Sequence, residues 1–262
     1  MTVEAEVLVD AREGVTFVTL NRPAAANAIT VPLATQLVAA LEQVAADPCA
    51  RLVVLRGAGR IFCGGGDLRS MVETPTIAGA LRDLTDVWHT AVRRLVGLPV
   101  PVLTVVHGAA AGAGLGLVAA SDIVIASETA TFSYAYSKVG LSPDGATSYF
   151  LPRLLGLRRA SELALTGRVL SAAEALDWGL VTQVVPAAEL EGAVGPLVAS
   201  LAGGPTRAFA AAKRLLADSG LRSLTDQLDA EAQTIVATGE SQDTAAAIHA
   251  RLTGQAPVFH GR

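Results

Sequence analysis

The chain has 262 residues, a formal net charge of −4 at pH 7 and two cysteines, Cys49 and Cys63. It is long enough for one α/β domain with an appendage and for a large core, so it needs neither disulfides nor a structural metal to fold. The lysines and arginines are scattered, which argues against nucleic acid as a partner. With few cysteines and no secretory leader pattern, the chain is expected in a reduced, cytoplasmic setting.

Strands and helices alternate through the first two thirds of the chain. β-Branched stretches predict strands at residues 6–10, 15–20, 51–57, 101–106, 122–126 and 180–185. Helices are predicted at residues 30–48, through 84–96, directly after 112–116 and at 171–179. Thr30 is the expected cap of the first helix, and Pro32 suits its first turn. This alternation is typical of an α/β fold.

The chain changes character near residue 189. Ser171 and Glu174 have capping-box spacing, and Gly179 is expected to end their helix. No convincing strand follows Pro186, and the remainder is alanine-rich and helical. We therefore predict a core, residues 1–188, and a C-terminal helical module, residues 189–262, that packs on the core or on a neighbouring subunit.

A nearly uncharged run, residues 107–126, approaches the length of a membrane span when the strand before it is included. His107 lies inside this run, Asp122 lies near its end, and its flanks have neither an aromatic belt nor a basic cluster. We therefore interpret it as a buried strand, a glycine-rich turn and a short helix, and expect no membrane partner.

Several kinds of chemistry lack their residues. The histidines at positions 89, 107, 249 and 260 have no partner four residues away and no cysteines near them, so no metal site is expected. There is no phosphate-binding loop ending in Gly-Lys-Ser/Thr, no complete G-x-G-x-x-G motif and no G-x-S-x-G elbow. Two glycine-rich turns remain, "FCGGGD" and "GAAAGAGLG", and each is as well explained by tight packing as by function.

Six stretches in order carry a resemblance over nearly the whole chain: "VTLNRPAAANAIT", "FCGGGDL", "PVLTVVHGAAAGAGLGLVAASDIVIAS", "FSYAYSKVGLSPDGATSYFLPRLLG", "LTGRVLSAAEALDWGLVTQVV" and "PVFHGR". Together they resemble the crotonase superfamily, the enoyl-CoA hydratases and isomerases. The resemblance implies an α/β, crotonase-like ββα superhelix with a C-terminal helical oligomerisation module, and a homotrimer or a dimer of trimers. It also implies an acyl-CoA thioester as substrate and no separate cofactor, because coenzyme A is part of that substrate.

In that family, two main-chain N–H groups hold the thioester oxygen, and the matching positions here are Gly66 and Ala113. Ala113 is expected where a strand feeds a helix, so its N–H belongs to a positively polarised helix start. Gly64, Gly65, Gly112 and Gly114 would leave room for close approach of the main chain.

The two glutamates of enoyl-CoA hydratases match Gly116 and Tyr136, so hydration loses its usual acid and base. Asp144 lies in a "GL-x-PD" context, as in family members that shift double bonds. A turn residue would explain this aspartate equally well on local grounds. The resemblance favours Asp144 as the acid-base of an isomerase that converts 3-enoyl-CoA to 2-enoyl-CoA.

Two alternatives stay open. Trp88 and His89 match a Trp-His pair of the 4-chlorobenzoyl-CoA dehalogenases, in which an aspartate attacks the ring and a histidine activates water. By that match Asp144 would be the nucleophile and His89 the base, although Tyr136 stands where those enzymes have tryptophan. Alternatively, the chain is a non-catalytic acyl-CoA-binding homologue.

Substrate contacts are also implied by the resemblance. The CoA nucleotide is expected near Arg22 and the main chain of Asp67 and Leu68, and Gly64, Gly114 and Tyr136 are also expected to bind substrate. Arg22 is explained equally well as a solvent-exposed charge in a loop, and the sequence does not decide whether Lys213 contacts CoA. Gly254 and Gln255 stand where the family often has basic residues that contact a neighbour's CoA.

Overall fold

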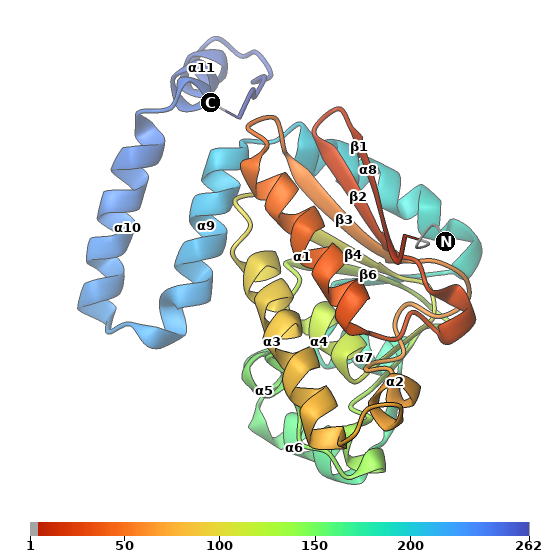
Figure 1. Ribbon diagram of the computed structural model, residues 1–262. Coiled ribbons are helices and arrows are strands. Elements are labelled where there is room, and N and C mark those ends of the chain that lie inside the picture. The colour runs from red at the N-terminus through yellow and green to blue at the C-terminus, as the bar shows by residue number, and fades with distance from the viewer. Residues whose placement is uncertain (1–4, 262) are drawn as a thin grey trace.

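The computed structural model describes residues 5–261 and contains a six-stranded sheet with the order β1-β2-β3-β4-β6-β9 (Figure 1). β1 pairs antiparallel with β2, and the remaining neighbours are parallel. The strands are β1 (Val7–Arg12), β2 (Val15–Leu20), β3 (Leu52–Gly57), β4 (Val102–Val106), β6 (Ile123–Ser127) and β9 (Gln183–Val185). All six lie within or overlap the predicted strands, although the last begins three residues later than predicted.

A second, three-stranded sheet was not predicted. Its strands are β5 (Ala109–Ala111), β7 (Thr131–Ser133) and β8 (Val169–Ser171). β5 is parallel to β7, and β7 is antiparallel to β8. Strands of three residues are too short for an alternating pattern to be recognised in sequence.

The helices begin and end as follows: α1 (Val31–Ala46), α2 (Leu68–Val72), α3 (Ile77–Val96), α4 (Ala113–Ala119), α5 (Thr147–Leu155), α6 (Leu157–Thr166), α7 (Ala172–Asp177), α8 (Leu190–Ala202), α9 (Thr206–Asp218), α10 (Leu224–Gly239) and α11 (Gln242–Leu252). Short 3-10 helices are η1 (Pro23–Ala25), η2 (Tyr136–Val139), η3 (Ala187–Glu189) and η4 (Ser219–Leu221). Thr30 caps α1 by accepting the Leu33 N–H at 3.2 Å, and Ser171 and Glu174 form the predicted capping box of α7.

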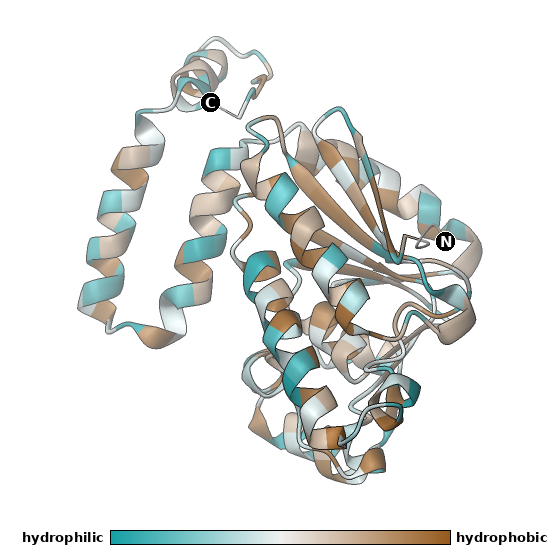
Figure 2. Cartoon of the chain, viewed as in Figure 1, coloured by the Kyte–Doolittle hydropathy of each residue, from teal (hydrophilic) through white to brown (hydrophobic). Residues whose placement is uncertain are grey.

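The central strands of the main sheet are buried on both faces, whereas the edge strand β1 is mostly exposed. On β3, Val53 and Leu55 belong to the large cluster beneath α1, α3 and α4, whereas Leu52 and Val54 belong to a second cluster beneath α8. Figure 2 shows the central strands as mostly hydrophobic, with polar positions toward the β1 edge. Such strands read as unbroken apolar runs because parallel sheets are covered on both sides.

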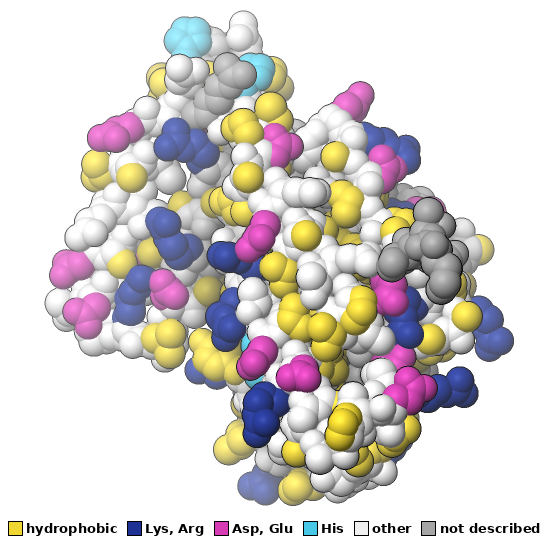
Figure 3. Space-filling model, viewed as in Figure 1, with side chains coloured by type: hydrophobic (Ala, Val, Ile, Leu, Met, Phe, Trp, Pro, Cys, Tyr) yellow, Lys and Arg dark blue, Asp and Glu magenta, His cyan; other side chains and the backbone are white. Residues whose placement is uncertain are grey.

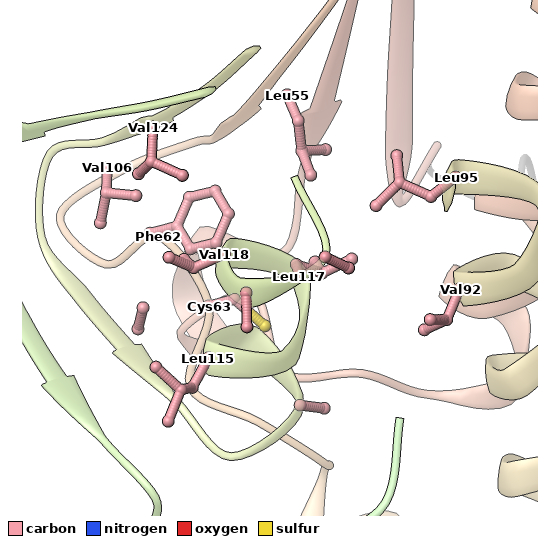
Figure 4. Close-up of a cluster of buried hydrophobic side chains, with 14 of the residues drawn as sticks. Leu55, Phe62, Cys63, Val92, Leu95, Val106, Leu115, Leu117, Val118 and Val124 are labelled. Atoms are coloured by element: carbon pink, nitrogen blue, oxygen red, sulfur yellow. The ribbon is translucent and has the colours of Figure 1, made fainter. Parts of the chain in front are cut away.

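Helix α4 lies in the centre of the large cluster, and all seven of its residues are buried. Its leucines pack with Phe62, Cys63 and Leu95 (Figure 4). The apolar run 107–126 is therefore interior, with helix α4 and strand β6 as the sequence predicted, whereas β5 lies where a glycine-rich turn was predicted. Within residues 5–261, no helix is long and apolar enough to cross a membrane.

The C-terminal helices α9, α10 and α11 form an arm that extends away from the sheet (Figure 1). The ammonium group of Lys213 on α9 pairs with Asp122 at 2.8 Å and thereby ties the arm to the core. No residue of α10 is buried, and apolar side chains lie exposed along the arm (Figure 3), among them Leu216, Leu224, Leu228, Ile235, Val236, Ile248 and Leu252. The helical character of the C-terminal region is as predicted, while the division into two domains at residue 188 stays a prediction.

Candidate active site

The first glycine-rich turn follows β3 and ends at the cap of α2. Gly64 donates its N–H to the Ala26 carbonyl at 2.9 Å, and the Gly65 carbonyl accepts the Ile29 N–H at 2.7 Å. Gly65 has φ of +99°, a conformation that side chains strongly disfavour. Among the described residues, the N–H of Gly66 has no hydrogen-bond acceptor. One main-chain donor is therefore left unused at this turn.

The second turn leads from β5 into α4. Gly112 has φ of +51° and donates its N–H to the Ser133 carbonyl at 3.1 Å. Ala113 is the first residue of α4, so its N–H has no partner within the helix. None of the residues 5–261 supplies an acceptor for it from elsewhere.

The two turns pack directly on one another, which requires glycine. A Cβ on Gly65 would lie 3.0 Å from the Ala111 carbonyl oxygen and 3.6 Å from the Cα of Gly112. A Cβ on Gly114 would lie only 2.4 Å from the Cys63 carbonyl oxygen, closer than real Cβ contacts allow. This close approach brings the unused N–H groups of Gly66 and Ala113 to the same cavity.

That cavity has a volume of about 450 Å³. Most of its lining is apolar, and Lys138 and Asp144 are its only charged lining residues in the part of the chain that the structure describes. The lining residues are Ile29, Gly64, Gly66, Leu68, Met71, Leu81, Leu84, Thr85, Trp88, Gly112, Ala113, Ala135, Tyr136, Lys138, Val139, Leu141, Ser142, Pro143 and Asp144. A cavity of this size and polarity suits an acyl group.

Asp144 reaches the cavity from the loop before α5. Gly145 and Ala146, the two residues after it, have φ of +58° and +63°. The hydroxyl of Thr147 donates to the main-chain carbonyl of Asp144 at 2.7 Å, and the Thr147 N–H donates to the same oxygen at 3.1 Å. The Tyr136 hydroxyl donates to Asp144 Oδ1 at 2.8 Å. The carboxylate is thus held on both its main-chain and side-chain atoms.

His89 lies next to Asp144 but does not line the cavity. Its Nε2 atom is 3.9 Å from Asp144 Oδ2 and accepts the N–H of Gly145 at 3.2 Å. Trp88, its neighbour on α3, is buried and packs against Gly145, where a Cβ would lie 2.4 Å from the indole nitrogen. Trp88 therefore explains why glycine follows Asp144, a contact that the sequence did not suggest.

Arg22 is engaged with protein groups. Its guanidinium donates to the Ala28 carbonyl at 2.6 Å and to Asp67 at 2.9 Å, and lies 3.3 Å from Glu6. Burial would raise the pKa of Asp67, but the hydrogen bonds from Arg22 and from the N–H groups of Ser70 and Arg69 outweigh it and lower that pKa. Arg22 thus braces the first turn, and its contact with CoA stays a prediction.

The remaining predicted contacts divide into two groups. Leu68 is half exposed at the start of α2 and lines the cavity, whereas Gly114 packs on Cys63 behind it. Burial raises the pKa of the Cys63 thiol to about 12, so this cysteine is a packing residue. The ammonium group of Lys213 forms an ion pair with Asp122.

Among residues 5–261, no three His, Cys, Asp or Glu side chains are grouped so as to hold a metal ion.

Residues 10–262 match the model of the family described as enoyl-CoA hydratase/isomerase. The chain belongs to this family of acyl-CoA enzymes, whose fold is the one the sequence predicted.

Among curated relatives, the chain is 38% identical over 260 residues to 1,2-epoxyphenylacetyl-CoA isomerase of Escherichia coli K12, covering 98% of each chain. It is 31% identical to 4-chlorobenzoyl coenzyme A dehalogenase-2 of an Arthrobacter species, covering 88% of this chain and 85% of the relative. The crystal structure of an enoyl-CoA hydratase from Bacillus anthracis superposes with a TM-score of 0.93 at 30% identity, over 98% of this chain and all of that one. The names of these relatives thus describe different reactions within one family.

Proposed function

We propose that this protein isomerises 3-enoyl-CoA thioesters to 2-enoyl-CoA thioesters, with Asp144 as the single acid-base. The observation that carries the proposal is one carboxylate in an apolar cavity that also exposes two unused main-chain N–H groups, those of Gly66 and Ala113. A double-bond shift needs one group that removes a proton and returns it, whereas hydration needs a second group to handle water.

The reaction moves one proton between two carbons. Asp144 takes the proton from C2, and the electron pair of that C–H bond delocalises over C2, C4 and the thioester oxygen, while the double bond between C3 and C4 is conjugated with it. The oxygen of the resulting dienolate accepts hydrogen bonds from Gly66 and Ala113. Asp144 then returns the proton to C4, and a double bond remains between C2 and C3. One carboxylate serves both carbons because they lie on one face of a planar dienolate.

Gly116 supports a shift rather than a hydration. It occupies the position of one hydratase glutamate, and a Cβ there would already lie 3.2 Å from both the Gly145 carbonyl oxygen and the Thr147 hydroxyl. A glutamate side chain has no room at this place without movement of the Asp144 loop. The relative named 1,2-epoxyphenylacetyl-CoA isomerase is also an isomerase, which agrees with the proposed reaction class.

The test is a coupled assay on purified protein with 3-hexenoyl-CoA, beside Asp144→Asn. We expect isomerisation by the wild type and a loss of at least about 10²-fold in the variant, as for removal of a general acid-base. Asp83→Asn, at an exposed position of α3, is the matched control and should keep the wild-type rate. Binding of CoA thioesters without turnover would contradict the proposal and favour an acyl-CoA-binding role.

The second candidate is a dehalogenase-like hydrolysis. The 3.9 Å separation of His89 Nε2 and Asp144 Oδ2 favours it, since a histidine beside the nucleophile could activate water against an aryl ester of Asp144. The relative named 4-chlorobenzoyl coenzyme A dehalogenase-2 supports the comparison. Chloride release from 4-chlorobenzoyl-CoA that requires both Asp144 and His89 would establish this reaction instead.

We also propose that the protein is a homotrimer or a dimer of trimers. The support is the arm, because no residue of α10 is buried within the chain and the helix still carries large apolar side chains. Monomeric soluble proteins rarely leave such surfaces open.

A further inference from the structure

We infer that Tyr136 is a positioning residue whose hydroxyl holds Oδ1 of Asp144, so that Oδ2 alone carries the proton. The inference rests on the proposed function, because it takes Asp144 as the acid-base.

The hydroxyl groups of Tyr136 and Thr147 both donate hydrogen bonds to Asp144. The single hydroxyl proton of Tyr136 has three oxygens within reach: Asp144 Oδ1 at 2.8 Å, the Asp144 carbonyl at 3.3 Å and the Thr147 hydroxyl at 3.3 Å. Thr147 donates its own proton to the Asp144 carbonyl at 2.7 Å. The proton of Tyr136 therefore goes to the shortest contact, Oδ1, which is also the charged one.

The other carboxylate oxygen of Asp144, Oδ2, has a different environment. Within the part of the chain that the structure describes, Oδ2 receives no hydrogen bond. The nearby Nε2 of His89 is 3.9 Å away and accepts the Gly145 N–H, so it presents a lone pair rather than a proton. Oδ2 is thus the carboxylate oxygen whose lone pairs are both free, whereas Oδ1 already accepts one hydrogen bond.

Tyr136 is fixed in place and stays protonated. Its ring is 9% exposed and packs edge-on against Tyr134 with 5.2 Å between ring centroids. Burial and the adjacent Asp144 charge raise the pKa of Tyr136 well above the usual range. The titratable groups facing Asp144 are Tyr136 from η2 and His89 from α3, and Lys138 is the other charged residue of the cavity lining. Over the working pH range Tyr136 can therefore only donate.

Two consequences follow for catalysis. The hydrogen bond fixes the orientation of the Asp144 carboxylate, so its loss lowers the rate of proton transfer more than it weakens substrate binding. It also stabilises the charged carboxylate, so its loss moves the acid limb of the pH–rate profile to higher pH. If Tyr136 had only a structural role, its substitution would neither change the shape of the pH–rate profile nor lower kcat selectively.

The experiment compares Tyr136→Phe with Tyr134→Phe, which removes a hydroxyl from the neighbouring ring without touching Asp144. For Tyr136→Phe we expect kcat to fall between about tenfold and a hundredfold, as for loss of a hydrogen bond to a charged group, with KM little changed. The acid limb should move up in pH, while Tyr134→Phe should match the wild type. Thermal unfolding of both variants verifies that they fold.

A second readout separates this inference from the proposed reaction. Exchange of the C2 protons of phenylacetyl-CoA with deuterium oxide requires the base and the two N–H groups but no double-bond shift. If the wild type exchanges but does not isomerise 3-hexenoyl-CoA, the proposed function fails, and slower exchange by Tyr136→Phe alone still supports the role of Tyr136. Unchanged kcat, acid limb and exchange in Tyr136→Phe, equal losses in Tyr134→Phe, or a wild type without either activity would overturn the inference.

Discussion

Ala113 contributes to the site through its main-chain N–H and not through its side chain. As the first residue of α4 it lies in the first turn, where proline fits because φ is suitable and no intrahelical bond is lost. Ala113→Pro therefore deletes the donor with little effect on the helix. We expect kcat for isomerisation to fall about 10²- to 10³-fold, as when one donor to a developing oxyanion is removed.

Ala113→Gly is the control for this variant, since it removes the methyl group and keeps the N–H. Steady-state kinetics of both variants, with circular dichroism to verify folding, measure the difference. A folded proline variant with the wild-type rate would show that this N–H does not hold the thioester oxygen.

Asp67 illustrates a charge that stabilises the fold beside the site. Its folded pKa is lowered, so the contribution is complete above the unfolded value near pH 4 and is lost as the pH falls through the folded value. Asp67→Asn keeps a capping residue for α2 but loses the ion pair with Arg22. At pH 7 it should lower the free energy of unfolding by about 1–2 kcal/mol.

Denaturant titrations of the wild type and Asp67→Asn between pH 2 and 7 measure this prediction. The difference should shrink as the pH falls below about 4. Glu191→Gln is the control, because the Arg56–Glu191 pair is exposed and should contribute less than about 0.5 kcal/mol. A pH-independent difference for Asp67→Asn would refute the ion-pair explanation.

At the scale of single residues, candidate site residues can be predicted from the sequence, but the contacts between them cannot. The resemblance implies Gly66, Ala113, Asp144 and Tyr136 as site residues, and the structure brings all four to one cavity. The bond from Gly145 to His89 joins residues 56 positions apart, so it depends on how α3 packs. No local pattern in a sequence encodes such a pairing.

At the scale of elements, the close approach of α4 to the first glycine turn creates the site. Gly114→Ala would place its Cβ 2.4 Å from the Cys63 carbonyl, a main-chain atom that cannot move aside easily. We expect a loss of about 1–3 kcal/mol in the free energy of unfolding, as for overpacking of a core, together with reduced kcat. Gly192→Ala in α8, with open space around it, should instead stabilise the protein by up to about 1 kcal/mol.

Equilibrium unfolding of the two alanine variants tests this contrast. Opposite signs are the predicted result, and a Gly114→Ala variant as stable and active as the wild type would contradict the packing argument. The contrast matters because a glycine run alone does not reveal which glycines are needed.

Sequence patterns predicted the long elements well and the short ones poorly. α1 and its cap Thr30 were predicted because four turns of apolar periodicity and a capping residue agree. β5, β7 and β8 have three residues each, and they are set by pairing between distant segments rather than by local pattern.

At the scale of the whole molecule, the arm is the unexplained surface. Leu224, Leu228 and Ile235 are spaced to share one face of α10, and all three are more than half exposed. If this face joins copies of the chain, Ile235→Asp should shift the protein from three or six chains toward smaller species. Gln233→Asp, which adds the same charge to the same helix at an exposed polar position, should not.

Sedimentation velocity over a range of concentrations measures the assembly. A monomeric wild type, or variants that assemble alike, would contradict the proposed role of the arm. The sequence could predict that this region is helical, but not which of its faces remains open, because that depends on the packing of α9 against the core.

The most direct test of Asp144 as the single acid-base follows one proton from C2 to C4. With 3-hexenoyl-CoA carrying deuterium at C2, transfer by a single carboxylate predicts product with deuterium at C4, in excess of what exchange with solvent allows. Asp144→Asn should abolish both the transfer and the isomerisation. Product whose C4 hydrogen comes only from water, formed at an undiminished rate by Asp144→Asn, would contradict the assignment of Asp144 as the single acid-base.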